Sequence, residues 1–205
     1  ASTVTGGGVT NTARVNGQNY TGGFAGYFGY GTASNNTVTN AAAVNGTSYV
    51  GGFGGAMNYS TVSGSLATLG GLVSGTSYVG GYAGVMNYST VSGSLATLGA
   101  LVSGSSYVGG FTGAMNQGVI YNTQSLRASP STGSVQGSSH TGGLVGFMDA
   151  VAAKSLNSDV PVTGGYRTGG LAGYLNSNFT TANTNVTTNS ATLLTASGAV
   201  VSTSD

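Results

Sequence analysis

Apolar residues along this chain come in short stretches separated by glycine, asparagine and serine. Representative stretches are Tyr49–Phe53, Met57–Ser63 and Leu66–Val73. No part of the chain keeps the 3.6-residue spacing of an amphipathic helix, and glycine at this density would cost a helix about 1 kcal/mol per residue relative to alanine. Short apolar stretches bounded by turn-forming residues are typical of β-strands. The pattern therefore predicts an all-β chain with roughly three strands in each such unit.

Self-similarity organises this pattern on a larger scale. The hexapeptide Ser48–Phe53 returns with one change as Ser77–Tyr82 and unchanged as Ser106–Phe111. Six glycine pairs mark six copies of the unit, and successive copies start 29, 29, 29, 33 and 27 residues apart. The middle copies are near-duplicates, and the fifth carries an insertion around Ser125–Thr132. A period in this range is the signature of a repeat architecture.

Alignment of the copies on the glycine pair shows which positions the repeat keeps. Three columns are apolar, and further columns hold glycine. The apolar columns are Val15, Val44, Val73, Val102, Val135 and Val162; then Phe24, Phe53, Tyr82, Phe111, Leu144 and Leu171; and then Phe28, Met57, Met86, Met115, Met148 and Leu175. We expect these columns to fill a narrow interior, and we expect the glycines to lie at corners that need a positive φ or a close backbone approach.

One copy is too small to bury its own apolar side chains, and stacking the copies solves this problem. The sequence therefore predicts a parallel β-solenoid of about six to seven coils, roughly 29 residues each, rising about 4.8 Å per coil. We expect one domain over residues 1–205. Residues 14–178 form six coils, with strand-like segments at 1–13 and 179–205 on either side.

Two further columns predict ladders along the solenoid axis. One begins with four tyrosines and ends with a histidine and an arginine. The other begins with asparagine. The members are Tyr20, Tyr49, Tyr78, Tyr107, His140 and Arg167 in the first, and Asn58, Asn87, Asn116, Asp149 and Asn176 in the second. We expect stacked rings in one and an amide ladder in the other, so the repeat encodes architecture rather than chemistry.

Charge is almost absent from the chain. Only 3% of the residues are charged and the net charge is +1, against roughly 25% charged residues in ordinary soluble proteins. A nucleic-acid binder needs a basic stripe to displace counterions from phosphates, and the sequence has none. There is no cysteine and no apolar run long enough for a membrane-spanning helix. The sequence leaves two interpretations of Ala1 open: a mature N-terminus left after cleavage at a small residue, or an unprocessed start.

Candidate chemistry is equally sparse. His140 is the only histidine, and a catalytic triad would need it together with an acid and a nucleophile. Asp149 is the nearest acid in sequence, yet both residues occupy ladder columns, which explains them structurally. Calcium needs six to eight oxygen ligands, which three scattered aspartates do not supply, and Lys154 is far from any phosphate-binding glycine loop. We therefore predict no enzyme, no catalytic, cofactor-binding or metal-ligating residue, and no cofactor.

The run Val-x-Gly-x-x-Tyr-Val-Gly-Gly-Phe-x-Gly-x-Met-Asn resembles the GLUG motif, whose Gly-Gly-Leu-Val-Gly core the fifth copy carries literally at Gly142–Gly146. The similarity covers roughly Val15–Leu175, with phenylalanine or tyrosine in place of the usual leucine in four copies. GLUG repeats occur in large secreted or surface-anchored bacterial proteins, including adhesins. The resemblance implies an extracellular, β-solenoid-like module, and it carries over no catalytic residue.

Three function hypotheses follow. The leading one is a subunit of an extracellular filament that polymerises with itself, because neither terminal segment offers a charged cap against end-to-end stacking. The strand-like segments 1–13 and 179–205 would pair with a neighbouring subunit, either by coil stacking or by strand donation. The second is a surface adhesin module that binds a glycan or another cell through exposed tyrosines or the insertion in the fifth copy. The third is an ice-binding solenoid, which needs unbroken threonine ranks, whereas the column of Thr61 and Thr90 breaks at Val119.

Overall fold

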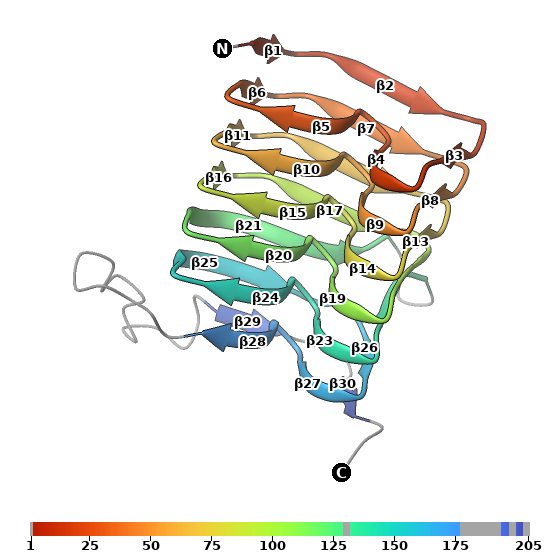
Figure 1. Cartoon of the computed structure of the whole chain (residues 1–205), viewed down its shortest axis with the longest axis vertical. Coiled ribbons are helices and arrows are strands. Elements are labelled where there is room, and N and C mark those ends of the chain that lie inside the picture. Colours follow the sequence, from red (N-terminus) through yellow and green to blue (C-terminus); the bar gives the residue numbers. More distant parts are fainter. Residues whose placement is uncertain (1, 129–131, 177–193, 197–199, 203–205) are drawn as a thin grey trace.

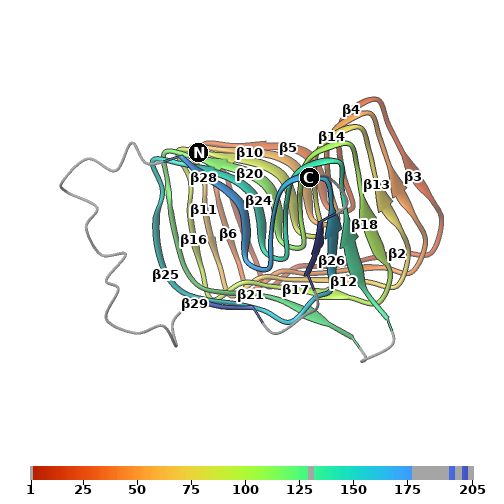
Figure 2. The same cartoon turned by 90° about the horizontal axis from the view of Figure 1, so that it is seen from below.

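The computed structural model describes residues 2–128, 132–176, 194–196 and 200–202, the last two segments as backbone only (Figure 1). Every regular element in these residues is a β-strand, and every strand pairing is parallel. The chain winds into a β-solenoid of about six turns of about 29 residues, which confirms the predicted fold class. Seen along the axis, the coils lie almost on top of one another (Figure 2).

The strands form four parallel sheets that run the length of the solenoid. The largest contains β1 (Thr3–Thr5), β6 (Thr32–Ser34), β11 (Thr61–Ser63), β16 (Thr90–Ser92), β21 (Val119–Arg127), β25 (Ala152–Ser158), β2 (Gly8–Asn11), β7 (Thr37–Asn40), β12 (Leu66–Leu69), β17 (Leu95–Leu98) and β29 (Leu194–Ala196). The second contains β5 (Ala25–Gly29), β10 (Gly54–Asn58), β15 (Ala83–Asn87), β20 (Thr112–Asn116), β24 (Val145–Asp149) and β28 (Ala172–Asn176).

The other two sheets are built from the shorter strands beside the glycine pairs. One contains β3 (Val15–Asn16), β8 (Val44–Asn45), β13 (Val73–Ser74), β18 (Leu101–Ser103), β22 (Ser134–Gln136), β26 (Val162–Gly164) and β30 (Val200–Ser202). The other contains β4 (Asn19–Gly22), β9 (Ser48–Gly51), β14 (Ser77–Gly80), β19 (Ser106–Gly109), β23 (Ser139–Gly142) and β27 (Tyr166–Gly169).

The expectation of three strands per coil was wrong, because a typical coil has five. The predicted strand Met57–Ser63 is split at Tyr59, which adopts φ 50°, and the predicted strand Leu66–Val73 is interrupted at Gly70 and Gly71. Left-handed residues recur in three columns along the axis. Most of them are not glycine: they are Tyr20, Tyr49, Tyr78, Tyr107, His140 and Arg167; Tyr30, Tyr59, Tyr88, Gln117 and Ala150; and Asn35, Asn122 and Ser155.

The glycine pairs and the glycines that follow them serve close packing rather than a positive φ. A Cβ atom on Gly84 would lie 2.5 Å from the carbonyl carbon of Tyr49 and 2.6 Å from the oxygens of Gly55 and Tyr78. Those atoms are backbone and cannot move aside. Glycine at this position therefore lets the second sheet bend tightly against the strands of the preceding coil, and of the two expected uses of glycine, close approach is the one that applies here.

The three predicted apolar columns form the core. Phe53, Tyr82 and Phe111 are fully buried and stack at centroid distances of 4.6 Å. The valine column is buried from Val44 onward, and the methionine column is buried as far as Met148. The last member of that column, Leu175, is 54% exposed, because no described strand lies beyond β28 in its sheet.

The terminal segments join the same sheets. Within 1–13, β1 pairs with β6 and β2 pairs with β7, as the strand-like composition predicts. Most of the segment 179–205 lies outside the described residues, but β29 pairs with β25 and β30 pairs with β26. The insertion in the fifth copy is shorter than expected, because Ser125 and Arg127 still pair with Ala96 and Leu98 inside the sheet.

Candidate functional site

His140 occupies the last ring position of the stacked tyrosine column. Its ring lies 4.8 Å from the Tyr107 ring, its Nδ1 is 2.7 Å from Ser139 Oγ, and its Nε2 is 2.9 Å from an Nη atom of Arg167. Arginine can only donate, so Nε2 of the neutral ring accepts and the proton lies on Nδ1. Nδ1 then donates to Ser139 Oγ, and this tautomer does not accept a proton from that serine.

The electrostatics around His140 favour the neutral ring. Burial lowers the pKa of His140 from its ordinary value of 6.5, and the positive charge of Arg167 lowers it further. Among the described residues, His140 makes no hydrogen bond to an acid. The structure therefore places His140 where the ladder interpretation predicted and does not bring Asp149 to it.

Two hydrogen bonds join three asparagines of adjacent coils into the amide ladder. Asn87 Nδ2 donates to Asn58 Oδ1 at 2.9 Å, and Asn116 Nδ2 donates to Asn87 Oδ1 at 2.7 Å. Asp149 is next in register, but a carboxylate has no proton to donate to Asn116 Oδ1, so it cannot continue the ladder. The Oδ1 atom of Asp149 is buried without a hydrogen-bond partner. The predicted ladder is confirmed from Asn58 to Asn116 and stops at Asp149.

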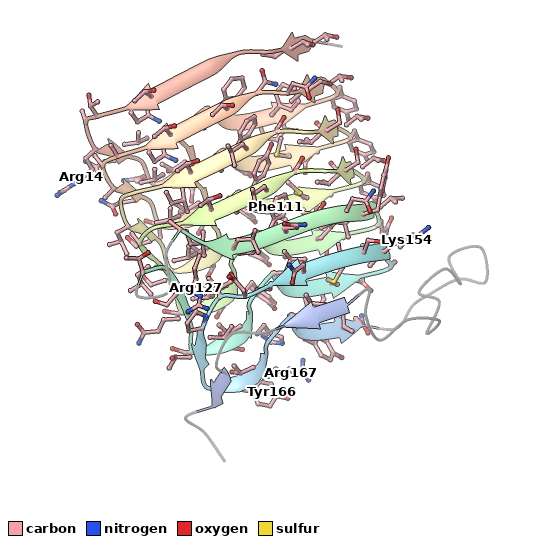
Figure 3. All side chains as sticks on the ribbon, turned by 180° about the vertical axis from the view of Figure 1, so that it is seen from behind. Arg14, Phe111, Arg127, Lys154, Tyr166 and Arg167 are labelled. Atoms are coloured by element: carbon pink, nitrogen blue, oxygen red, sulfur yellow. The ribbon has the colours of Figure 1, made fainter. Side chains whose placement is uncertain are left out.

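The few charged side chains are scattered over the surface. Arg14 and Lys154 point outward on opposite sides of the solenoid, and Arg127 lies near Asp159 with Nε and Oδ2 3.9 Å apart (Figure 3). The described residues hold no group of three or more histidines, aspartates or glutamates that suits a metal ion. No helix in this part of the chain is suited to cross a membrane.

The inner tyrosine column, which we define as Tyr20, Tyr49, Tyr78 and Tyr107, covers small outward-facing residues of the second sheet. Its rings stack at 4.8–4.9 Å with interplanar angles of 9–11°. Tyr49, Tyr78 and Tyr107 pack against a buried cluster of Ala56, Val85 and Ala114. Burial, and then the neighbouring Tyr107 and Tyr49, raise the pKa of Tyr78. This column is half core and half surface.

The outer tyrosine row, which we define as Tyr30, Tyr59 and Tyr88, was not recognised in the sequence. These residues follow β5, β10 and β15, stack at 4.9 and 4.7 Å, and are 64%, 50% and 49% exposed. The repeat of Asn58–Tyr59–Ser60 at Asn87–Tyr88–Ser89 was the available signal. In each stacked pair, the ring faces that point toward each other are covered. The row therefore presents ring edges and hydroxyl groups to solvent.

Threonines also form a column on the outer surface of the largest sheet. Thr61 pairs in register with Thr32 and Thr90, and Thr3 pairs with Thr32, so the column has four threonines. It ends at Val119, as expected from the sequence. The rank is longer than the sequence comparison of Thr61 with Thr90 indicated, but it does not cover the whole face.

The first coil presents a free edge in all four sheets. Each of β1, β2, β3, β4 and β5 ends its sheet and pairs with only one strand among the described residues. The inward side chains Val4, Val9 and Val15 of this coil are only partly buried, although the equivalent residues in later coils are fully buried. Figure 1 shows this edge at the end of the solenoid where the N-terminus lies.

A scan against family models found no match, and searches of the curated proteins and of the solved structures found none either. The similarity to the GLUG motif rests on the residues of the repeat alone. The functional interpretation therefore depends on the free edge, the two tyrosine features and the shortage of charge.

Proposed function

We propose that this chain is a structural subunit of an extracellular filament, in which copies stack end to end along the solenoid axis. The observation that carries the proposal is the free edge of β1 to β5, where backbone hydrogen-bonding groups and partly buried valines lie together. Such an edge is a template for a further layer of parallel strands. The occupant we infer is the C-terminal coil of a second copy.

The columns at the two ends support a head-to-tail junction. Phe24 and Phe28 begin two apolar columns at the N-terminal end, and Leu171 and Leu175 are the last described members of the same columns. Stacking one copy on the next would place apolar residues against apolar residues, as inside the solenoid. With a net charge of +1, long-range repulsion between copies is small.

The strand pairing of residues 1–13 favours one of two forms of filament assembly. The sequence left both coil stacking and strand donation open for residues 1–13. Because β1 and β2 already pair with β6 and β7 of the same chain, this segment is not free to leave as a donated strand. Stacking of a complete coil on its open side is the form of assembly that we propose.

Thr10 offers a sharp test of this edge. Thr37 N donates to Gly7 O and Ala41 N donates to Asn11 O, so alternate residues of β2 face β7 and Thr10 faces the open side. Thr10→Pro removes an N–H that the chain does not use internally, whereas Thr10→Ala keeps it. We expect electron microscopy of the purified chain to show filaments for wild type and Thr10→Ala and none for Thr10→Pro.

Two results would sink the proposal. One is a wild-type chain that stays monomeric in sedimentation at high protein concentration. The other is a Thr10→Pro variant that forms filaments as readily as wild type while keeping the wild-type circular dichroism spectrum. If Thr10→Pro loses this spectrum, a chain with an N-methylated peptide bond at Thr10 takes its place. This modification removes the same N–H donor and keeps the threonine side chain.

The second candidate is an adhesin module within a longer surface protein, in line with the GLUG resemblance. The exposed outer tyrosine row favours it, because three aromatic residues on one edge of the solenoid form a ready contact surface. In that case a preceding coil of the same polypeptide covers the free edge. A mature polypeptide much longer than these 205 residues, seen in a denaturing gel of the source material, would favour the adhesin module.

A further inference from the structure

The outer tyrosine row has chemistry that does not depend on filament assembly. Tyr59 and Tyr88 stack at a centroid distance of 4.7 Å with an interplanar angle of 2°, and each is about half exposed. Tyr30 stacks on Tyr59 at 4.9 Å and 5°. Equivalent ring carbons of neighbouring tyrosines therefore lie one above the other, with their hydroxyl groups open to solvent.

The backbone fixes this arrangement before any reaction occurs. Tyr59 N donates to Asn87 O at 2.9 Å, Tyr88 N donates to Asn116 O at 2.9 Å, and both tyrosines have a φ of 50°. Only rotation of the side chains is needed to tilt two rings toward each other. The side chains have room to do so, because they project from a corner between two sheets and not from a packed face.

We propose that the outer tyrosine row is a site of oxidative dityrosine cross-linking between adjacent coils, at Tyr59 with Tyr88 or Tyr30, driven by hydrogen peroxide through a haem peroxidase. Each phenol loses one electron and one proton to give a tyrosyl radical. Two radicals join at the ring carbons ortho to oxygen. As aromaticity returns, the two ring hydrogens leave as protons and each phenolic oxygen takes up one proton again. Overall, two tyrosines lose two hydrogens and one hydrogen peroxide becomes two waters.

The inner tyrosine column is the contrasting case within the same chain. Its rings are equally close, but Tyr49, Tyr78 and Tyr107 are held against Ala56 and Val85. Ring carbons must move from the stacking distance to bonding distance, and packed rings cannot make that movement freely. Loss of the phenolic proton is also harder at Tyr78, whose pKa is raised by burial and by its tyrosine neighbours. Cross-linking is therefore expected in the outer row and not among Tyr49, Tyr78 and Tyr107.

The test uses the wild-type chain and two matched variants that each keep an aromatic ring. Dilute protein is treated with hydrogen peroxide and a haem peroxidase, and dityrosine is measured by its fluorescence and by the loss of two hydrogens in the intact mass. Tyr59→Phe removes the shared partner and leaves Tyr30 and Tyr88 two coils apart, at about 9.6 Å. We expect this variant to lose the intramolecular link and Tyr78→Phe to retain the wild-type yield.

The methionine column allows the link to be placed. Cyanogen bromide cleaves after Met57 and Met86, which puts Tyr30, Tyr59 and Tyr88 on three different fragments. A cross-linked chain should release two of these fragments joined. The double variant Tyr30→Phe/Tyr88→Phe leaves Tyr59 alone in the row and must also lose the link, which guards against a folding defect in Tyr59→Phe.

Three outcomes would overturn the proposal. The first is a wild-type yield in Tyr59→Phe or in the double variant. The second is loss of the link in Tyr78→Phe, which would assign it to the inner column. The third is dityrosine found only between separate chains and never in the band of monomer mass. A joined pair of fragments that depends on Tyr59 and is independent of Tyr78 supports it.

Discussion

The middle coils, residues 44–116, and the C-terminal coils, residues 119–176, are built on one repeat but differ inside. In the middle coils Val50, Val79 and Val108 fill one inward column, and each is fully buried. In the fifth coil the same column holds Thr141, which is equally buried and whose Oγ1 has no hydrogen-bond partner. The C-terminal coils thus follow the same backbone path, but a buried hydroxyl without a partner replaces a valine side chain in their interior.

Other columns show the same contrast. Ala67 and Ala96 of the middle coils are followed by Ser125 and then Ser158, whose buried hydroxyls also lack partners. A pocket of about 200 Å³, partly open to solvent, is lined by residues of the paired strands β21 and β25. The middle coils have buried polar atoms too, but Ser60 and Ser89 donate to backbone carbonyls, and the buried hydroxyl of Tyr82 lies beside Ser65.

Backbone stacking and interior packing are therefore separable in this fold. The parallel ladders continue in register through both regions, because the backbone pattern does not depend on which small or medium side chain points inward. The cost of an unpartnered hydroxyl, about 1–3 kcal/mol each, is carried by neighbouring coils that are well packed. Changes in the middle coils should therefore be felt more strongly than changes at the end.

The largest expected effect breaks the middle coils at a close contact between backbone segments. Gly84→Ala places a methyl group within 2.6 Å of backbone atoms on two sides, so neighbouring coils must separate. We expect a loss of about 3 kcal/mol or more in the free energy of unfolding, measured by chemical denaturation. Gly8→Ala is the matched control, because nothing lies within 4 Å of its added Cβ. Equal destabilisation by both substitutions would contradict the close-approach explanation.

A reciprocal exchange in one column should move the two regions in opposite directions. Val79→Thr buries an unpartnered hydroxyl in the middle coils and should destabilise the chain by about 1–3 kcal/mol. Thr141→Val removes such a hydroxyl from the fifth coil and should stabilise the chain by about 1 kcal/mol. Thermal unfolding of the two variants measures the pair. If Thr141→Val lowers Tm, the hydroxyl has a role that the contrast between the regions does not explain.

The smallest effect concerns pH. Since the folded-state pKa of His140 is lowered below 6.5, the unfolded chain binds the proton more tightly. The stability that His140 contributes is present above pH 6.5 and is lost as the pH falls through this value toward the lowered folded-state pKa. We expect Tm to decrease between pH 7.5 and about pH 5, and His140→Tyr, which extends the inner tyrosine column, to abolish that dependence. An unchanged pH profile in His140→Tyr would be evidence against this role.

The repeat made the architecture predictable because columns of like residues demand stacking. Val102, Met86 and Asn87 lie where the alignment placed them, and the amide ladder runs as expected from Asn58 to Asn116. The strand count was not predictable in the same way. Glycine is the usual marker of a left-handed turn, but Tyr59 and Tyr49 adopt that conformation here, held by stacking and by backbone hydrogen bonds between coils.

The candidate site shows the same limit. Sequence placed His140 in the tyrosine column, and the structure agrees, but its contacts with Ser139 and Arg167 depend on side-chain directions that a linear pattern does not contain. The exposure of the outer tyrosine row is likewise a property of the corner where it lies. Residue types in a column are readable from sequence, whereas their orientation toward core or solvent comes from the turns between strands.

The in-register pairing of near-duplicate coils also means that the length of this solenoid can change in fixed steps. The segment Asn58–Gly70 recurs unchanged at Asn87–Gly99, so recombination between the two copies would remove or add one whole coil. Each such event would change the length of the solenoid by one fixed step of about 4.8 Å and leave every column intact. A deletion within a strand that is shorter than one coil would shift the pairing register of the strands beside it. Gain or loss of whole coils is therefore a way in which the length of the solenoid can evolve without disturbing the fold.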